Sequence, residues 1–300
     1  MEDISGLPAS PQVLLDALRY EVYRALRMPP QDWKRGVMDY FLRFVLLRGV
    51  RLALEFDRQA AARGFAHASQ ALLPNFVGRV QADGAGAVPQ AGPLLVASNH
   101  PGSVDALVVA AQLERQDVKL IARDMPFLRN LPGIHACLIY STRDMAQRAV
   151  VLRQALHHLE NGGTLLLFPS GNLDPDPATL PGAEKALETW TSSAALFLRR
   201  IPGLRLVVAT TSHMIAPRWL NHPLAAWRRH PWDRQFWAEL MQTSSQLLFP
   251  GRYCVSPRVS FSRGFTLDEL GADRTGESIR QAVIAQAKRQ LKLHFQFFQD

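Results

Sequence analysis

From residue 76 onward, the chain alternates short apolar runs with amphipathic segments of helical spacing. The runs are LLVAS at 94–98, VKLIA at 118–122, CLIYS at 137–141, TLLLF at 164–168 and LRLVVAT at 204–210, with RVSFSRGF at 258–265 as a late strand. The helical segments lie at 103–115, 144–161 and 182–200. Short apolar runs that alternate with helices are typical of β-α-β units. The sequence therefore predicts an α/β fold with a mainly parallel central sheet flanked by helices.

The first 75 residues differ, because their apolar residues recur at helical spacing only. A helix is expected after Ser10, a suitable N-cap, with Pro11 in its first turn and its end before Met28. Its apolar positions are Leu14, Leu18, Val22 and Leu26. We therefore divide the chain into an N-terminal helical region, residues 1–75, with membrane association as one interpretation, and an α/β domain, residues 76–300.

Two later stretches lie outside this alternation. Residues 212–254 are rich in Trp, Pro and Arg, and this composition predicts an irregular insertion or edge element. Near the C-terminus, apolar residues spaced by four predict a helix with a basic opposite face. The apolar positions are Ile279, Val283, Ala287, Leu291 and Phe295, and the basic ones are Arg280, Lys288, Arg289 and Lys292.

The most apolar stretch, VMDYFLRFVLLRGVRLAL at 37–54, has the length of a membrane span but contains four charged residues. A spanning helix would bury these charges at a cost of about 2.5 to 3.5 kcal/mol each near the bilayer centre. On a helix, Arg43, Arg51, Glu55 and Arg58 fall on one side, and Leu42, Val45, Leu46 and Leu52 turn largely away from it. This pattern predicts an amphipathic helix, packed either on the protein's own core or at a membrane interface.

The formal net charge of +8 predicts a surface that attracts anions such as nucleic acid, anionic lipid headgroups or acidic carrier proteins. The N-terminus is acidic and no uninterrupted apolar run follows it, so the sequence predicts no secretory signal and a cytoplasmic protein. Cys137 and Cys254 lack metal-ligand spacing, and the sequence favours buried structural thiols in a reducing compartment.

The segment NHPGSVD at 99–105 follows the apolar run LLVAS directly. A turn that begins at Asn99 and a helix with Ser103 as its N-cap place His100 at the carboxyl end of a strand and Asp105 in the first helical turn. Open α/β sheets generally carry their active sites at this edge. Taken alone, Asp105 needs no functional role, because an aspartate in the first helical turn interacts favourably with the helix dipole. A single histidine in a loop likewise gives little indication of function. As a pair, the carboxylate can fix the imidazole tautomer, so that the other ring nitrogen faces outward as a base.

No convincing protein nucleophile accompanies this pair. The segment FPSGN at 168–172 contains a serine before a glycine, but it lacks the glycine two residues earlier that a nucleophile elbow requires. We infer that His100 deprotonates a substrate hydroxyl. Asp174 and Asp176 are the residue type of metal ligands, yet the prolines between them indicate a rigid exposed loop, and the sequence predicts no metal site.

NHPGSVD resembles the N-H-x-x-x-x-D motif of the glycerolipid acyltransferase superfamily, which includes glycerol-3-phosphate and lysophosphatidic acid acyltransferases. In that family the motif is followed by a strand that ends in an arginine, then a helix, then a strand that runs into F-P-E-G-T-R. Here CLIYSTR supplies Arg143, and TLLLFPSGN follows the helical segment 144–161. The resemblance covers about residues 90–210, and RVSFSRGFTLDEL resembles the family's late strand and turn.

The chain also departs from the family pattern. Ser170 stands where the family has glutamate, and Asn172 and Leu173 stand where it has threonine and arginine. The family associates that arginine with the acceptor's phosphate, and leucine offers neither charge nor donors. The fourth motif, LVVATTSHM, lacks its usual proline. The resemblance therefore favours a lysophospholipid or related lipid over glycerol-3-phosphate as acceptor. Arg143 could still meet a phosphate, or it could be a surface or ion-paired arginine.

The resemblance implies acyl transfer from a thioester, on coenzyme A or acyl carrier protein, to a lipid hydroxyl. His100 would be the general base and Asp105 would orient it, and backbone N–H groups near Gly102 or Gly171 would face the developing oxyanion. The implied substrate-binding residues are Asn99, Gly102, Ser103, Arg143, Phe168, Pro169, Ser170, Gly171 and Asn172. No metal and no cofactor other than the acyl donor is implied. The partners would be acyl-CoA or acyl carrier protein, a lysolipid and an anionic membrane, with the protein peripheral on its inner face.

Two other classes stay open. One is an inactive relative that binds lipid or protein, which the lost Glu and Arg favour and the intact His-Asp pair disfavours. The other is a nucleic-acid binder, which rests on charge alone. Its basic residues are scattered and match no nucleic-acid motif, so no nucleic-acid partner is predicted.

Overall fold

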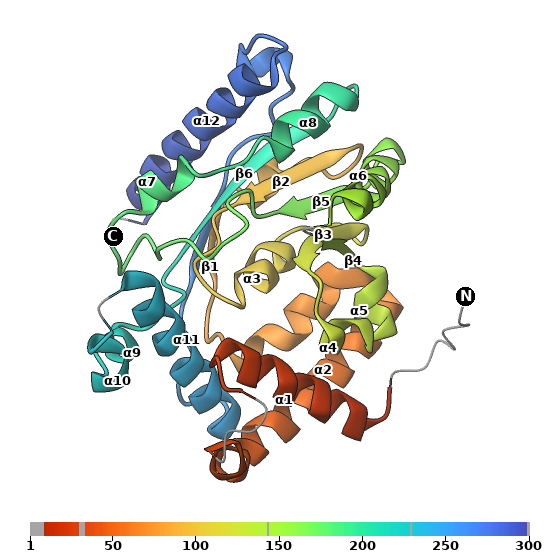
Figure 1. Ribbon diagram of the computed structural model, residues 1–300. Helices are drawn as coiled ribbons and strands as arrows, with labels where there is room; N and C mark the ends of the chain where they lie inside the picture. The colour runs from red at the N-terminus through yellow and green to blue at the C-terminus, as the bar shows by residue number, and fades with distance from the viewer. Residues whose placement is uncertain (1–8, 30–33, 143, 229, 299–300) are drawn as a thin grey trace.

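The core of the structure is a twisted sheet with strand order β1-β7-β6-β2-β5-β3-β4 (Figure 1). The computed structural model describes residues 9–29, 34–142, 144–228 and 230–298. The strands are β1 (Gln81–Asp83), β2 (Leu94–Ser98), β3 (Val118–Arg123), β4 (Leu138–Ser141), β5 (Thr164–Leu167), β6 (Arg205–Ser212) and β7 (Arg258–Phe261). Neighbouring strands are parallel except β6 and β7, which run antiparallel. The predicted fold class, a mainly parallel α/β sheet flanked by helices, is confirmed.

Two details of the strand prediction were wrong. The late strand ends at Phe261 rather than at 265. The Ser262 N–H still donates to the Val208 carbonyl, but the Ser262 hydroxyl rather than its backbone meets the Val208 N–H, and beyond it Phe265 forms only an isolated bridge with Leu206. The edge strand β1 was not predicted; its three residues pair with β7. So short a segment carries no periodic signal of its own.

Helices cover both faces of the sheet. In β2, Leu94 and Val96 face one apolar cluster, whereas Leu95 and Ala97 face the other, as alternation along a strand requires. The first cluster lies under α2 (Lys34–Leu72), α3 (Asp105–Ala111), α4 (Pro126–Arg129), α5 (Pro132–Ala136) and α11 (Pro231–Leu248). The second lies under α6 (Met145–Glu160), α7 (Ala183–Leu187), α8 (Ser193–Arg200) and α12 (Gly276–Phe297). The molecule is thus a three-layer α/β/α arrangement (Figure 1).

The N-terminal helices pack on the first face. α1 (Pro11–Ala25) begins as predicted, with the Ser10 side chain accepting a hydrogen bond from the Val13 N–H. In α2, Val45, Leu46 and Val50 are buried, so this helix does pack on the protein's own core. Within the described residues, no helix is long and apolar enough to cross a membrane. The division of the chain at residue 75 stays a prediction.

A second apolar stripe of α2 faces outward. Its exposed members are Val37, Tyr40, Phe41, Phe44 and Leu47. Apart from the adjacent pair Tyr40 and Phe41, successive positions are three or four residues apart and therefore lie along one side of the helix. Tyr40, Phe41 and Phe44 are 78%, 67% and 71% exposed, which is unusual for aromatic side chains that touch only their own protein.

The interpretation of residues 212–254 as irregular was wrong. This stretch forms the short helices α9 (Pro217–Leu220) and α10 (Pro223–Ala226) and the 18-residue helix α11. The buried face of α11 includes Gln235, Gln242 and Gln246, while Trp232 lies 41% exposed. A helix with glutamines inside and an aromatic residue outside inverts the pattern by which helices are found in a sequence.

The predicted helix at 182–200 is in fact two helices, α7 and α8. The chain breaks between them because the Thr191 N–H and hydroxyl both donate to the Pro169 carbonyl, which fixes a turn beside the loop after β5. Three short 3-10 helices, at Leu73–Asn75, Ala85–Ala87 and Asp268–Leu270, complete the described elements.

The cysteines are half-buried rather than buried, and neither forms a disulfide. Burial raises the pKa of the Cys137 thiol, because the thiolate would lose its hydration. The neutral thiol is therefore the resting form of Cys137, as suits a structural cysteine.

The C-terminal helix α12 covers β6 and β7 with the predicted apolar residues, except that Phe295 is exposed and His294 is buried instead. The His294 ring lies 2.7 Å from the Ser212 hydroxyl at Nε2 and 2.8 Å from the Ser260 hydroxyl at Nδ1. Burial, helped by the charges of His213 and Arg258, lowers the pKa of His294 to about 4. The folded protein therefore holds this imidazole neutral.

We expect His294 to make folding sensitive to mild acid. Between about pH 6.5, the ordinary histidine pKa, and pH 4, His294 is protonated in the unfolded chain but stays neutral in the folded chain. The free energy of unfolding should therefore fall as the pH drops from about 6.5 to 4. The shift corresponds to about 3 kcal/mol of unfolding free energy. Urea unfolding of the wild type and of His294→Gln between pH 7 and 4 measures the effect. The contributions of the other titratable groups cancel in the difference between the two unfolding free energies. If the difference in unfolding free energy between the two proteins did not change with pH, His294 would not be the source of the acid sensitivity.

Candidate active site

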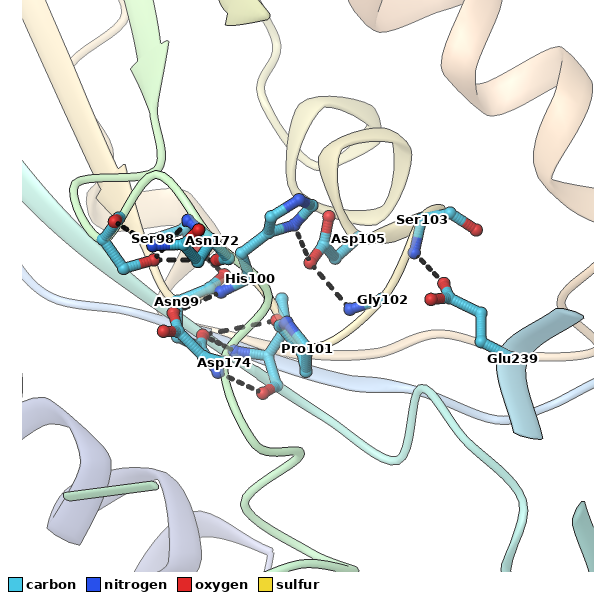
Figure 2. Close-up of polar contacts among 12 residues, drawn as sticks. Ser98, Asn99, His100, Pro101, Gly102, Ser103, Asp105, Asn172, Asp174 and Glu239 are labelled. Carbon is cyan, nitrogen blue, oxygen red and sulfur yellow. Dashed lines mark hydrogen bonds and ion pairs between the residues drawn. The ribbon is translucent and has the colours of Figure 1, made fainter. Parts of the chain in front are cut away.

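The predicted dyad lies at the carboxyl edge of the sheet, with His100 in the loop after β2 and Asp105 at the start of α3 (Figure 2). Asn99 anchors this loop to the end of β6. Its side-chain N–H donates to the Thr211 carbonyl at 2.9 Å, and its Oδ1 accepts from the Thr211 N–H at 2.8 Å. Because Asn99 is buried and bridges two strands, its side chain supports the site rather than meeting a substrate directly.

His100 and Asp105 contact each other as the spacing predicts. The distance from His100 Nδ1 to Asp105 Oδ2 is 2.8 Å, and the same oxygen accepts from the Gly102 N–H at 3.1 Å. Asp105 is fully buried, whereas the His100 side chain is 28% exposed. No described residue forms a hydrogen bond with His100 Nε2. This arrangement holds a proton on Nδ1 and leaves Nε2 free to accept one.

Two further features define the surroundings of His100. Its ring stacks on Phe168, with centroids 4.4 Å apart and planes 25° from parallel. Burial by itself disfavours the imidazolium, but Asp105, through its charge and hydrogen bond, and the charges of Glu239 and Asp174 outweigh this effect. The pKa of His100 is therefore raised above its ordinary value. A base of this kind is well suited to take a proton near neutral pH.

Asp174 clamps the backbone of His100. The His100 N–H donates to Asp174 Oδ2 at 2.9 Å, and the Asp174 N–H donates to the His100 carbonyl at 2.7 Å. Burial raises the pKa of Asp174 to about 6. The reciprocal pair fixes the first residue of the dyad to the loop that follows β5.

The prediction that Asp174 and Asp176 lie in an exposed loop was therefore wrong. Asp176 is also fully buried, and it accepts hydrogen bonds from the backbone N–H groups of His213, Met214 and Ile215. Local sequence rules missed this because the partners are 37 to 39 residues away. The Asp176 carboxylate is occupied by backbone donors and serves the structure of the β6 end.

The segment 168–172 surrounds the dyad without offering a nucleophile to it. Phe168 stacks on His100, and the Pro169 carbonyl is held by Thr191. The Ser170 hydroxyl donates to the Asn172 carbonyl at 2.9 Å, and the Asn172 side chain donates back to the Ser170 carbonyl at 3.2 Å. Within the described residues, this serine is therefore engaged in its own turn and not with His100.

The two backbone groups expected to face an oxyanion are both engaged. The Gly102 N–H donates to Asp105, and the Gly171 N–H donates to the Phe168 carbonyl at 3.0 Å. Gly171 has a φ of +64°, which glycine adopts without strain, and its position closes this turn. The N–H groups of Gly102 and Gly171 themselves thus each close a local turn, and an oxyanion site formed by N–H groups near these residues stays a prediction.

Ser103 is not the N-cap of α3, which begins at Asp105 with Val104 in the cap position. The Ser103 N–H instead donates to a carboxylate oxygen of Glu239, on α11 (Figure 2). Four residues earlier on α11, the Gln235 side chain donates to the Pro101 and Asp174 carbonyls at 3.0 and 2.8 Å.

Neither Gln235 nor Glu239 was predicted as a site residue. Their only signal is the polar series Gln235, Glu239, Gln242 and Gln246, which recurs at helical spacing. Arg143, the remaining predicted substrate-binding residue, lies outside the described residues.

An apolar cavity of about 280 Å³ adjoins the dyad loop. Its wall includes Ser103 and side chains from seven elements, among them Leu52, Phe56, Leu107, Leu120, Phe127 and Leu247. Because α3 contributes to the wall and also carries Asp105, the cavity and the dyad share one helix. A cavity of this character suits a hydrocarbon chain.

Residues 79–192 match the family model described as Acyltransferase. Among solved structures, the chain is similar to the crystal structure of the 1-acyl-sn-glycerophosphate (LPA) acyltransferase PlsC from Thermotoga maritima. The two sequences are 16% identical, and the match covers 94% of this chain and 96% of that chain with a TM-score of 0.42. No curated protein matches the chain.

Proposed function

We propose that this protein moves a fatty acyl group from a thioester donor to a hydroxyl of a lysophospholipid or related lipid. The match of residues 79–192 to the family model described as Acyltransferase supports this proposal. The donor is acyl-CoA or acyl carrier protein, and no other cofactor takes part. The observation that carries the proposal is the 2.8 Å contact between His100 Nδ1 and Asp105, which leaves Nε2 available. His100 is the general base and Asp105 the group that orients it.

In the proposed reaction, His100 Nε2 takes the proton of the acceptor hydroxyl as its oxygen attacks the thioester carbonyl. A C–O bond forms and the carbonyl becomes a tetrahedral oxyanion. When the intermediate collapses, the C–S bond breaks and the thiolate leaves with the proton that His100 held. Asp105 stabilises the imidazolium between these steps, because its negative charge is buried beside it.

The apolar cavity supports a lipid substrate. Its wall is built almost entirely of aliphatic and aromatic side chains, and it reaches Ser103 in the dyad loop. Burial of hydrocarbon contributes about 0.8 kcal/mol per CH₂ group, so even a few methylenes would bind appreciably there. We propose that the cavity receives an acyl chain while the reacting carbonyl or hydroxyl stays near His100.

Leu173 should exclude small phosphorylated acceptors. We expect lysophospholipids to be acylated faster than glycerol-3-phosphate in a side-by-side assay with radiolabelled acyl-CoA and, separately, acyl carrier protein. Leu173→Arg should raise the rate with glycerol-3-phosphate, because it adds a phosphate partner, whereas Leu173→Met is the matched control. If glycerol-3-phosphate were the better acceptor of the wild type, the inference from Leu173 would be wrong.

The same assay separates the proposed enzyme from its alternative, an inactive relative that binds lipid or protein. Ser170 and Leu173, which replace charged family residues, are the observation in favour of the alternative. Folded protein that binds lysolipid but forms no product with any donor would support a binding role.

We also propose that the protein associates peripherally with the inner face of an anionic membrane through the outward stripe of α2. Phe41 and Phe44 lie at its centre with the exposed Arg43 between them, which suits insertion beside anionic headgroups. We expect Phe41→Ser/Phe44→Ser to lose most cosedimentation with phosphatidylglycerol vesicles, and high salt to release the wild type. Val150→Ser, at an exposed apolar position of α6, is the control. Release by detergent alone would contradict a peripheral association.

A further inference from the structure

Helix α11 presents two side chains to the dyad loop, although it begins 126 residues after Asp105. Gln235 holds the carbonyl of Pro101, and Glu239 accepts from the N–H of Ser103. Side chains of α11 thus form hydrogen bonds with the loop backbone on both sides of Gly102, at Pro101 and at Ser103. A side chain at position 102 would meet Glu239, since a Cβ built there lies 3.2 Å from its Oε1. Glu239 and the dyad loop are thus in close contact.

Two further polar residues on the same face of α11 bind only backbone groups in the described structure. Gln242 holds the Ala216 N–H and the Met214 carbonyl, each at 2.8 Å. Gln246 holds the carbonyls of Phe76 and Tyr253, both at 3.0 Å. A neutral amide therefore suffices for binding backbone groups on this helix. At position 239, which contacts the dyad loop at Ser103, the same face carries a carboxylate instead.

We propose that Glu239 is a positioning residue for His100, holding the Pro101–Ser103 turn and supplying negative charge that stabilises the imidazolium formed during proton transfer. This inference rests on the proposed general-base role of His100.

Three carboxylates, each from a different part of the chain, lie around His100 and favour its protonated form. Asp105 on α3 touches it, Asp174 in the loop after β5 holds its backbone, and Glu239 acts from α11 through its charge. Burial raises the pKa of Glu239, while the Ser103 N–H and the charge of His100 favour its ionised form. The His100 imidazolium and the Glu239 carboxylate therefore stabilise each other.

The test uses the full chain and the substitution Glu239→Gln, which keeps an oxygen for the Ser103 N–H but removes the charge. NMR titration of histidine-labelled protein gives the pKa of His100 without any substrate, with His100→Ala to identify its signal. We expect Glu239→Gln to lower that pKa and to reduce kcat about tenfold, the effect of a modest loss of imidazolium stabilisation. The acid limb of the rate profile should move to lower pH, while KM for the lipid stays the same.

Asp233→Asn is the matched control, because it removes one charge from the same helix two turns from Glu239. It should leave the His100 titration unchanged. Glu239→Ala should lose the brace as well, and so lower both kcat and the melting temperature. An unchanged His100 pKa in Glu239→Gln would overturn the proposal and leave Glu239 a structural brace like the glutamines. A lowered pKa in a protein that transfers no acyl group would refute the proposed function and leave the electrostatic link intact.

Discussion

His100→Ala is expected to reduce acyl transfer by a hundredfold to ten-thousandfold, the usual contribution of a general base. The variant keeps Asp105 and the loop backbone, but it has no group to accept the proton of the acceptor hydroxyl. The substitution removes the partly exposed ring, its stacking on Phe168, worth about 0.5 to 1.5 kcal/mol, and one hydrogen bond of the buried Asp105. The protein should stay folded, because Asp105 keeps the hydrogen bond from the Gly102 N–H. Initial rates with saturating lysolipid and a thermal melt measure the two effects separately.

His157→Ala is the control for this experiment, since it removes an exposed histidine from α6 on the other face of the sheet. It should retain wild-type turnover. A folded His100→Ala protein with nearly wild-type transfer would rule out His100 as the base, whatever the family of residues 79–192.

Asp105→Asn is expected to cost on the order of a hundredfold or more in kcat. The amide oxygen can replace Oδ2, which accepts from both His100 and Gly102, but a neutral amide cannot stabilise the imidazolium. Its NH₂ group would take the place of Oδ1, which has no hydrogen-bond partner among the described residues. A buried unsatisfied donor costs about 1 to 3 kcal/mol, so the melting temperature should fall as well.

The pH dependence of Asp105→Asn separates catalysis from stability. In the wild type the pKa of His100 lies above its ordinary value, so the rate should rise with pH through a limb above about 6.5. Removing the Asp105 charge lowers that pKa, and the limb of the residual activity should shift to lower pH. Asp176→Asn is the control, because this buried carboxylate binds only backbone N–H groups and should affect stability without moving the limb. Identical behaviour of the two variants would mean that Asp105 has only a structural role.

Local patterns were sufficient for the sheet and the dyad. The run LLVAS coincides with β2, because a fully buried strand of a parallel sheet must be apolar on both faces. His100 and Asp105 could be paired from the sequence since only five residues separate them, across a turn that leads into a helix. The segment 168–172, whose Phe168 stacks on His100, was instead indicated by the resemblance to the glycerolipid acyltransferases.

The sequence by itself therefore determined the fold class, the dyad and its place at the carboxyl edge of the sheet, because each follows from residues close together in the chain. Only the tertiary structure decided what surrounds the dyad. Asp174 meets His100 across 74 residues and Glu239 meets Ser103 across 136, and nothing in their local sequences indicates a buried role. Helix α11 was not predicted because glutamines that bind backbone polar groups share its inner face with apolar residues such as Ala238. Hydrogen bonds of this kind leave no hydrophobic periodicity, so they appear only when the chain has folded.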